Sequence, residues 1–285
     1  MNIEEIKKVA IIGAGLMGSG IAQVFAQSGY QVTLIDISQE QFEKSKQDIE
    51  FYIDKMVSRK TIPSAVKEVA LSNIRYSEKK EDAVKADLII EAVTENKELK
   101  KTIFTQLDNI CREEVIFASN TSSIPITELA AATKRPDRFI GTHFMSPVPL
   151  MQCVELIRGL ETDNEVFKMI EELMKRIRKE PCESNDFPGF ISNRIFMALL
   201  NEAFYCVYEG VGTPENIDKV ITLSLNHPVG PLRLADNVGL DTILNVLEVL
   251  FEGYRNPKYA PCPLLVKMVK ANWLGRKTKR GFYIY

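Results

Sequence analysis

Short apolar runs alternate with helically spaced apolar positions over about the first 180 residues of the chain. The apolar runs predict strands at 9–12, 32–35, 86–93, 115–118, 138–143 and 154–157. Helical spacing predicts a helix after residue 18 and further helices at 39–60, 97–110 and 164–178, with more helix near residue 63. Strands that alternate with helices predict an α/β fold with a doubly wound, mostly parallel sheet.

The pattern changes at residues 185–190, which read Asn-Asp-Phe-Pro-Gly-Phe. Beyond this point apolar positions recur at helical spacing over 191–210, 214–225, 240–254 and 263–273, and strand-like alternation does not return. We therefore predict two domains, an α/β domain over 1–185 and an all-α domain over 186–285.

Residues 9–36 combine a strand, a glycine-rich turn, a helix and a second strand that ends on an acid. Gly13 allows a tight turn, Gly15 lets the backbone approach a pyrophosphate, and Gly18 lets helix and strand pack closely. The helix N-terminus offers unpaired N–H groups and a partial positive charge to the phosphates. The segment thus predicts a Rossmann-like domain that binds a dinucleotide. The residues expected at the cofactor are Gly13, Gly15, Leu16, Met17, Gly18 and Asp36.

Asp36 also bears on which dinucleotide is bound. A carboxylate at this position accepts hydrogen bonds from both ribose hydroxyls and repels a 2′-phosphate. Ile37 and Ser38, which follow it, supply no cation to attract that phosphate. NAD is therefore favoured over NADP. The alternative is that Asp36 only caps the helix that begins near Gln39.

Composition narrows the class of protein further. Of the 285 residues, 45% are hydrophobic and 26% charged, as in ordinary globular proteins. A net charge of −2 without a basic tract argues against nucleic-acid binding, and no apolar run approaches the roughly 20 residues of a membrane helix. The first strand begins too early for a secretory signal, and five scattered cysteines suit reduced thiols, so a cytoplasmic protein is expected. Two isolated histidines do not predict a metal site.

Polar residues lie where ligands bind in such sheets, at the carboxyl ends of strands. They are the Asn120–Ser123 loop, His143 and Glu155. A histidine can exchange the proton that accompanies hydride transfer, and a carboxylate can fix its tautomer. The alternatives are that His143 is structural and that the Asn-Thr-Ser-Ser loop caps a helix beginning at Pro125.

Six motifs run in order over nearly the whole chain. They are Gly-Ala-Gly-Leu-Met-Gly (13–18), Ser-Asn-Thr-Ser-Ser-Ile-Pro-Ile-Thr (119–127), His-Phe-Met-Ser-Pro (143–147), Asp-Phe-Pro-Gly-Phe-Ile-Ser-Asn-Arg (186–194), Asn-His-Pro-Val-Gly-Pro (226–231) and Gly-Arg-Lys-Thr-x-x-Gly-Phe-Tyr (275–283). Together they resemble the 3-hydroxyacyl-CoA dehydrogenases, and the length is most similar to that of bacterial members acting on 3-hydroxybutyryl-CoA. The resemblance implies NAD as the cofactor, an acyl-CoA thioester as the substrate, and a homodimer or higher homo-oligomer formed through the helical domain.

The resemblance also assigns roles to matching residues. His143 is implied as general base in oxidation and general acid in reduction, with Glu155 as its partner. Ser122 and Asn193 match residues that bind the reacting oxygen or the thioester carbonyl. The cofactor pocket is implied to include Glu95, Lys100 and Asn120.

Basic residues near the end of the helix predicted at 39–60 suit the phosphates of CoA. Lys55 and Arg59 are four residues apart and share one helix face. Arg59 matches a family position that is often lysine, and the ring of Tyr52 is a candidate to stack on the adenine. The alternative is that these cations only complement the helix dipole.

The chain departs from the family pattern in a few places. Ser146 replaces the usual asparagine, and its shorter side chain cannot offer separate amide donor and acceptor groups, so we expect weaker substrate binding there. Lys279 and Arg233 also differ from common family residues, at positions expected to lie on the surface. His227 opens a Pro/Gly-rich loop and is interpreted as structural.

Two other functions were weighed. One is a β-hydroxyacid dehydrogenase of the 6-phosphogluconate type, which shares the glycine pattern but uses a lysine as acid–base. The other is an NAD-binding regulatory protein without activity, for which Ser146 would be an early sign. The presence of Ser122, His143, Glu155 and Asn193 speaks against both.

Overall fold

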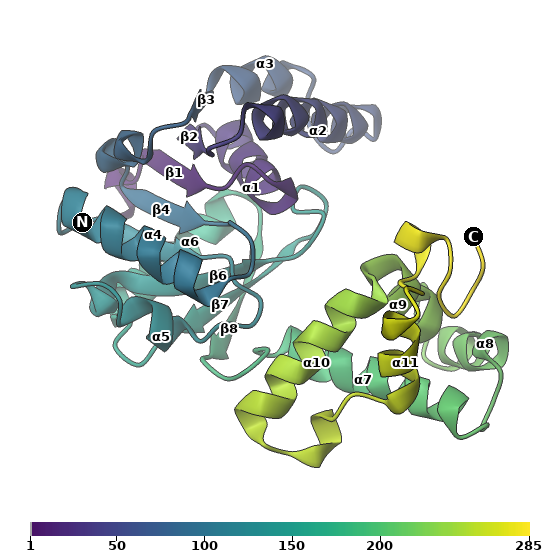
Figure 1. Cartoon of the computed structure of the whole chain (residues 1–285). Coiled ribbons are helices and arrows are strands. Elements are labelled where there is room, and N and C mark those ends of the chain that lie inside the picture. The colour runs from purple at the N-terminus through teal and green to yellow at the C-terminus, as the bar shows by residue number, and fades with distance from the viewer. Residues whose placement is uncertain (1) are drawn as a thin grey trace. The chain divides into compact units, whose positions relative to one another are not determined.

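The structure, a computed structural model, describes residues 2–285 and divides the chain into two compact units, Met1–Phe187 and Pro188–Tyr285 (Figure 1). The boundary predicted from the sequence lay between residues 185 and 186. Each unit is described by itself below.

The first unit is built on one eight-stranded sheet with the strand order β3-β2-β1-β4-β5-β6-β7-β8. All neighbouring strands run parallel except β6 and β7, which are antiparallel. This arrangement confirms the predicted doubly wound, mostly parallel sheet. The strands are β1 (Lys8–Ile12), β2 (Gln31–Ile35), β3 (Ile74–Ser77), β4 (Leu88–Glu91), β5 (Ile116–Ser119), β6 (Phe139–Phe144), β7 (Cys153–Arg158) and β8 (Glu180–Asn185).

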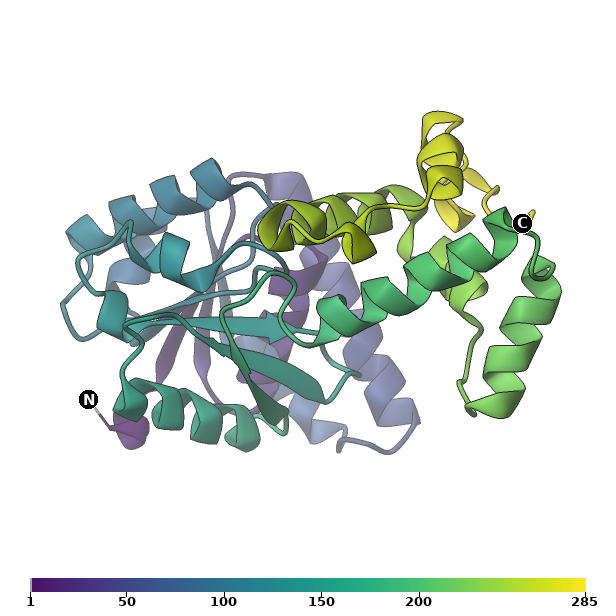
Figure 2. The ribbon, with the colours of Figure 1, turned by 90° about the horizontal axis from the view of Figure 1, so that it is seen from below.

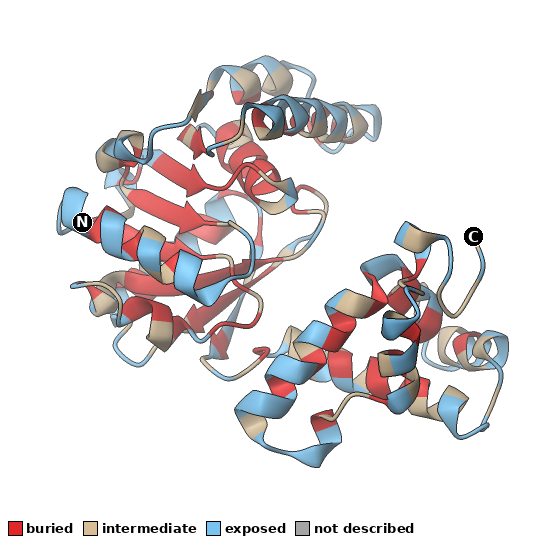
Figure 3. Ribbon diagram, in the orientation of Figure 1, coloured by how far each residue is buried: buried red, intermediate tan, exposed pale blue. Residues whose placement is uncertain are grey.

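Helices cover both faces of this sheet (Figures 1 and 2). They are α1 (Leu16–Gln27), α2 (Gln39–Ser58), α3 (Ala65–Ser72), α4 (Lys97–Ile110), α5 (Ile126–Ala130) and α6 (Asn164–Arg176). Successive strand side chains point to opposite faces, so each strand serves two cores. Ile116 and Ile140 join the core that includes side chains of α1, α2 and α6. Phe117 and Phe139 turn to the other face, where the Phe139 ring lies 4.6 Å from the ring of Phe104 in α4. Strands buried on both faces read as continuous apolar runs, which is why their sequence signal was strong (Figure 3).

Two strands, β3 and β8, were not predicted from the sequence. Both lie at the edges of the sheet. β8 reads Glu-Pro-Cys-Glu-Ser-Asn, and only Ser184 within it is fully buried. An edge strand packs against a neighbour on one side only, so it can be polar and carry proline. Apolar periodicity could not identify it.

The second unit is helical around one apolar core, as predicted. Its helices are α7 (Ser192–Tyr208), α8 (Pro214–Ser224), α9 (Pro231–Val238), α10 (Leu240–Tyr254) and α11 (Pro263–Lys270). The core includes Leu200, Phe204, Leu247 and Leu265. Helix α9 was not predicted, because it is short and follows the Pro/Gly-rich loop at 226–231. Across residues 2–285, no helix is both long and apolar enough to cross a membrane.

Candidate active site

The glycine turn lies between β1 and α1 and has the geometry that a dinucleotide requires. Gly13 has φ +105°, and a Cβ there would lie 2.7 Å from the carbonyl oxygen of Ala92 at the end of β4. At Gly18 a Cβ would lie 1.8 Å from the Gly13 carbonyl oxygen, so helix and turn pack too closely for any side chain. Around Gly15, at the N-terminus of α1, no atom lies within 4 Å of such a Cβ. The turn is therefore closed toward the protein and open in front of Gly15, where a pyrophosphate can approach the helix N-terminus.

A cavity of about 700 Å³ lies beside this turn. Its volume is within the range of small-molecule and cofactor sites. Asp36 lies on its wall, and the cavity is otherwise lined largely by apolar side chains, among them Ile12, Ile35, Ile37, Ala92, Leu99 and Ile103. Apolar walls together with the Asp36 carboxylate suit an adenosine, whose base has flat apolar faces and whose ribose offers hydroxyl groups.

Asp36 is held by backbone N–H groups. Its Oδ2 accepts a hydrogen bond from Ala14 N at 2.7 Å, and its Oδ1 accepts one from Ser38 N at 3.1 Å. The N-cap of α2 is Ser38, whose side chain accepts from Gln41 N. The alternative that Asp36 caps this helix is therefore wrong.

Two lysines that were not predicted from the sequence share the cavity with Asp36. Lys79 and Lys80 follow β3, which pairs with β2 so that Ser77 is the partner of Ile35. Asp36 follows Ile35 directly, so the two strand ends deliver an acid and two cations to the same cavity. Glu78 and Glu81 line it as well. A search for cations next to Asp36 in the sequence could not find residues that follow a neighbouring strand.

His143 and Glu155 lie opposite each other on the antiparallel strands β6 and β7. His143 Nδ1 lies 2.8 Å from Glu155 Oε2, and both residues are buried. In the tautomer that carries a proton on Nδ1, Nδ1–H donates to the Glu155 carboxylate, so the pairing favours one orientation of the imidazole ring. The twelve-residue spacing thus corresponds to a cross-strand pair. Among residues 2–285, no cluster of three His, Cys, Asp or Glu residues has the arrangement to hold a metal ion.

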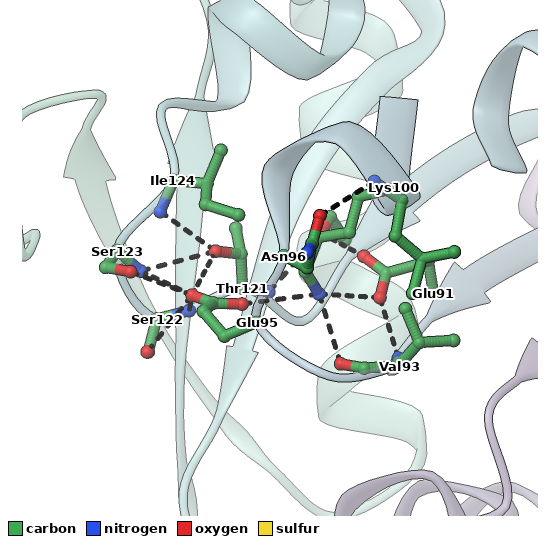
Figure 4. Close-up of polar contacts among 11 residues, drawn as sticks. Glu91, Val93, Glu95, Asn96, Lys100, Thr121, Ser122, Ser123 and Ile124 are labelled. Atoms are coloured by element: carbon green, nitrogen blue, oxygen red, sulfur yellow. Dashed lines mark hydrogen bonds and ion pairs between the residues drawn. The ribbon is translucent and has the colours of Figure 1, made fainter. Parts of the chain in front are cut away.

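The Asn-Thr-Ser-Ser loop follows β5 and is organised by Glu95. Glu95 Oε1 accepts hydrogen bonds from Thr121 Oγ1 at 2.6 Å, Ser122 N at 3.0 Å and Ser123 N at 3.1 Å (Figure 4). Burial alone would raise the pKa of Glu95, but the Lys100 ammonium and these donors outweigh it and lower the pKa below its usual value. Asn120 Oδ1 accepts from Phe144 N at 2.9 Å, which ties the loop to the end of β6.

This loop is not the cap of the following helix. The N-terminal N–H groups of α5, from Ile126 and Thr127, donate instead to the carboxylate of Asp186 at 2.9 and 2.7 Å. That role accounts for the acid at the start of the motif at 186–194. The alternative of a capping Asn-Thr-Ser-Ser loop is wrong.

Lys100 lies behind the loop and pairs with two acids. Its side chain is 1% exposed, and its Nζ lies 2.6 Å from Glu91 Oε1 and 3.3 Å from Glu95 Oε2. Glu91 ends β4 and is completely buried. Burial raises the pKa of Glu91, while Lys100 and its hydrogen bonds act in the opposite direction. Sequence reasoning missed Glu91; the available signal was an acid closing an otherwise apolar buried strand.

The remaining predicted residues lie elsewhere on the two units. Lys55 Nζ lies 5.9 Å from the ring centroid of Tyr52, and Arg59 is the C-cap of α2. Tyr52 lines a small pocket together with Leu16 and the Pro147–Pro149 segment. Ser146 is exposed in the loop after β6. Asn193 is in the first turn of α7, in the second unit.

The sheet, the glycine turn and the adjoining cavity define a dinucleotide-binding domain. Residues 8–187 match the NAD binding domain of the 3-hydroxyacyl-CoA dehydrogenases, and residues 189–285 match the C-terminal domain of the same enzymes. The chain belongs to the 3-hydroxyacyl-CoA dehydrogenase family. This finding confirms the resemblance, the class of enzyme and NAD as the cofactor, and it decides against the 6-phosphogluconate type.

Individual relatives agree over nearly the full length. The chain is 51% identical to a 3-hydroxybutyryl-CoA dehydrogenase of Bradyrhizobium diazoefficiens, over 98% of this chain and 96% of the relative. It is 50% identical to a probable 3-hydroxybutyryl-CoA dehydrogenase of Bacillus subtilis, over 99% of this chain and 98% of that protein. The crystal structure of the (S)-3-hydroxybutyryl-CoA dehydrogenase from Ralstonia eutropha superposes with a TM-score of 0.95 at 47% identity, over 99% of each chain.

Proposed function

We propose that this protein interconverts (S)-3-hydroxybutyryl-CoA and acetoacetyl-CoA, with NAD as the hydride carrier and a preference for short acyl chains. The observation that carries the proposal is the buried His143–Glu155 pair, with 2.8 Å between Nδ1 and Oε2, in the same unit as the dinucleotide turn. The names of relatives about 50% identical to the chain support the choice of substrate.

Each group of the site has a separate task. When bound, NAD would supply the nicotinamide that takes the hydride from C3 of the substrate and returns it in the reverse direction. His143 Nε2 takes the proton of the 3-hydroxyl group during oxidation and donates it to the 3-keto oxygen during reduction. Glu155 holds the imidazole in one tautomer and stabilises its charged form. Ser122 donates a hydrogen bond to the reacting oxygen, and Asn193 remains a predicted contact to the substrate.

The cofactor is held by the turn and by the residues around the cavity. The pyrophosphate binds at Gly13–Gly18, where Leu16 and Met17 begin α1, and Asp36 binds the adenine ribose. Glu95 and Asn120 would contact the bound cofactor, and Lys100 would hold Glu95 in place. The open space in front of Gly15 supports this placement.

The CoA moiety binds beside α2. Lys55 and Arg59 attract its phosphates, and the Tyr52 ring stacks on its adenine. Ser146, in the loop after β6, takes a weaker part in substrate binding than the usual asparagine. The 5.9 Å approach of Lys55 to the Tyr52 ring supports a shared site, because one anionic aromatic ligand can use both groups.

We further propose a cytoplasmic homodimer formed through the helical unit. Val220, Leu223 and Leu225, in and directly after α8, are 58%, 74% and 57% exposed. Contiguous exposed apolar side chains of this size favour association between subunits. A sedimentation measurement that finds a monomer at micromolar concentration would contradict the dimer.

The decisive experiment is an assay of acetoacetyl-CoA and longer 3-ketoacyl-CoAs with NADH, on wild-type protein and His143→Gln. We expect the substitution to lower kcat/KM by about 10²–10⁴-fold, the usual contribution of a positioned acid–base. His227→Gln is the matched control, since it changes the only other histidine, and it should retain activity. Activity of His143→Gln within tenfold of wild type would disprove the mechanism.

A further inference from the structure

The end of β4 carries a buried acid that the proposed mechanism does not use. Glu91 is 0% exposed, and both of its carboxylate oxygens are engaged (Figure 4). Oε1 lies 2.6 Å from Lys100 Nζ and accepts from Val93 N at 2.7 Å. Oε2 accepts from Ser119 Oγ, at the end of β5, at 2.6 Å. Glu91 therefore fixes one end of Lys100 and joins the carboxyl ends of two strands.

Lys100 transmits this position to a second acid. Its Nζ lies between Glu91 Oε1 and Glu95 Oε2 and also donates to the Val93 carbonyl at 3.3 Å. An ammonium group held by one buried acid and one carbonyl has little freedom to move. The ion pair with Glu95 therefore forms at the place where the ammonium group is held, and this determines where the Glu95 carboxylate lies.

Glu95 in turn holds the loop that carries Ser122. Its Oε1 accepts from the Ser122 backbone N–H at 3.0 Å and from Ser122 Oγ at 3.3 Å. The neighbouring hydroxyl groups of Thr121 and Ser123 donate to the same oxygen at 2.6 and 2.9 Å. The backbone at Ser122 is thus placed by an oxygen whose own position is set through Lys100, and the hydroxyl proton turns from Glu95 to the reacting oxygen when substrate binds.

Stability alone gives a weak reason for such a network. Glu91 and Lys100 lose nearly all of their hydration here, and a buried pair is often no more stabilising than apolar residues of the same size. What a fully satisfied buried network provides is a single arrangement of its members. In this site the member at the outer end is the serine proposed to bind the reacting oxygen.

We propose that Glu91 is a positioning residue for the reaction: through Lys100 and Glu95 it holds the Ser122 backbone, and with it Oγ, at the position from which the hydroxyl binds the reacting oxygen. The inference rests on the proposed function, because it takes the role of Ser122 from there. Glu91 itself touches neither substrate nor cofactor.

A double-mutant cycle between Glu91→Gln and Ser122→Ala tests this coupling. We expect each single variant to lower kcat/KM for acetoacetyl-CoA by about tenfold or more, and Glu91→Gln to cost less than about twofold once Ser122 is already alanine. A purely structural role of Glu91 would cost the same factor in both backgrounds. Equal factors would overturn the inference while leaving the proposed function intact.

The chain offers a matched control. Asp108, on α4 like Lys100, forms another buried ion pair, with Arg135 Nε at 2.7 Å, and its carboxylate binds Lys134 N and Arg135 rather than the 119–123 loop. Asp108→Asn should lower stability against urea, as Glu91→Gln does, but leave kcat/KM of the folded protein within about twofold. A loss of kcat/KM equal to that of Glu91→Gln would overturn the inference.

A second variant covers the case in which Glu91→Gln does not fold. Glu91→Gln/Lys100→Met removes both buried charges together, which proteins tolerate better than the loss of one partner. We expect it to fold, as judged by circular dichroism. We also expect it to lower kcat/KM by about tenfold or more with Ser122 present, and by less than about twofold once Ser122 is alanine. Wild-type kcat/KM in this folded double variant would overturn the inference. If Ser122→Ala leaves kcat/KM unchanged while Glu91→Gln lowers it, Ser122 does not have the proposed role and the inference is overturned. If His143→Gln leaves kcat/KM unchanged, the proposed function is overturned instead.

Discussion

Both units bury carboxylates, but they use them differently. In the helical unit, Asp236 accepts hydrogen bonds from the backbone N–H groups of Phe282 and Tyr283, each at 3.0 Å, and Asp218 accepts from Leu232 N and Arg233 N at 2.8 and 3.0 Å. In the α/β unit, Glu91 and Glu155 instead meet titratable side chains, Lys100 and His143.

The difference separates architecture from chemistry. A carboxylate bound to backbone N–H groups fixes the path of the chain, and burial raises the pKa of Asp236, whose side-chain partner is the Tyr285 hydroxyl rather than an imidazole or an ammonium group. A carboxylate bound to a histidine or lysine fixes the position and charge of a group that can act on a ligand. The four predictions below test this distinction, from the largest expected effect to the smallest.

Glu155→Gln should damage activity far more than stability. The amide cannot stabilise a protonated His143 and can stabilise the wrong tautomer, so we expect kcat to fall by about 10²-fold or more. Steady-state kinetics with acetoacetyl-CoA and NADH measure the loss, and urea unfolding measures stability. A variant that loses stability but keeps its kcat would show that Glu155, like Asp236, only fixes the path of the chain.

Asp236→Asn should show the opposite pattern. It weakens charge-assisted bonds to two N–H groups and to the Tyr285 hydroxyl, which lies 3.2 Å from Oδ2. We expect a loss of about 2 kcal/mol in the free energy of unfolding, the usual scale for hydrogen bonds to a buried charge. The kcat of the folded fraction should stay within about twofold of wild type. Chemical denaturation and an assay at low temperature check the two parts.

Asp36 is the case that could break the distinction, since it bonds to backbone N–H groups yet lies on a cavity wall. Asp36→Ser should raise kcat/KM with NADPH by about tenfold, because repulsion of the 2′-phosphate disappears while Lys79 remains on the same wall. Adding Lys79→Ala should remove most of that gain.

The control for this pair is Lys46→Ala in the Asp36→Ser background, since Lys46 does not line the cavity of Asp36. It should leave the NADPH gain unchanged. If Asp36→Ser changes only the free energy of unfolding, and the ratio of kcat/KM with NADH to kcat/KM with NADPH stays as in wild type, Asp36 only fixes the path of the chain.

Lys179 extends the comparison to a cation. It is buried and donates to the carbonyls of Val148 and Met151, and burial lowers its pKa from 10.5 to about 8. The unfolded chain keeps this proton up to its ordinary pKa, whereas the folded protein releases it near pH 8. Between about pH 8 and 10.5 the unfolded state binds more protons, so folding stability should rise with pH.

The slope is at most about 1.4 kcal/mol per pH unit. We compare the urea midpoints of wild type and Lys179→Met from pH 7.5 upward. The contributions of other titrating groups are the same in both proteins and cancel in the difference. The variant should lack this rise while keeping kcat near wild type at neutral pH. Parallel stability curves would show that Lys179 titrates normally.

Local patterns sufficed wherever burial was complete. The central strands and the helix Leu240–Tyr254 were predicted because both faces, or one regular stripe, are apolar. The edge strands β3 and β8 were not predicted because each has only one buried side chain, so neither an apolar run nor an alternation marks them. His143 and Glu155 were found because each follows or lies in an apolar run, and their bond forms through the antiparallel pairing of β6 and β7.

The sequence by itself determined the α/β-then-α order, the glycine turn and its acid, and the family with its cofactor. These features depend on residues close together in the chain. Only the tertiary structure brought Glu91 through Lys100 to the Ser122 loop, placed Lys79 and Lys80 beside Asp36, and gave Asp186 rather than the serine loop the task of capping α5. The physical reason is that strand order and register bring distant residues together, and no local pattern of apolar and polar positions records that pairing.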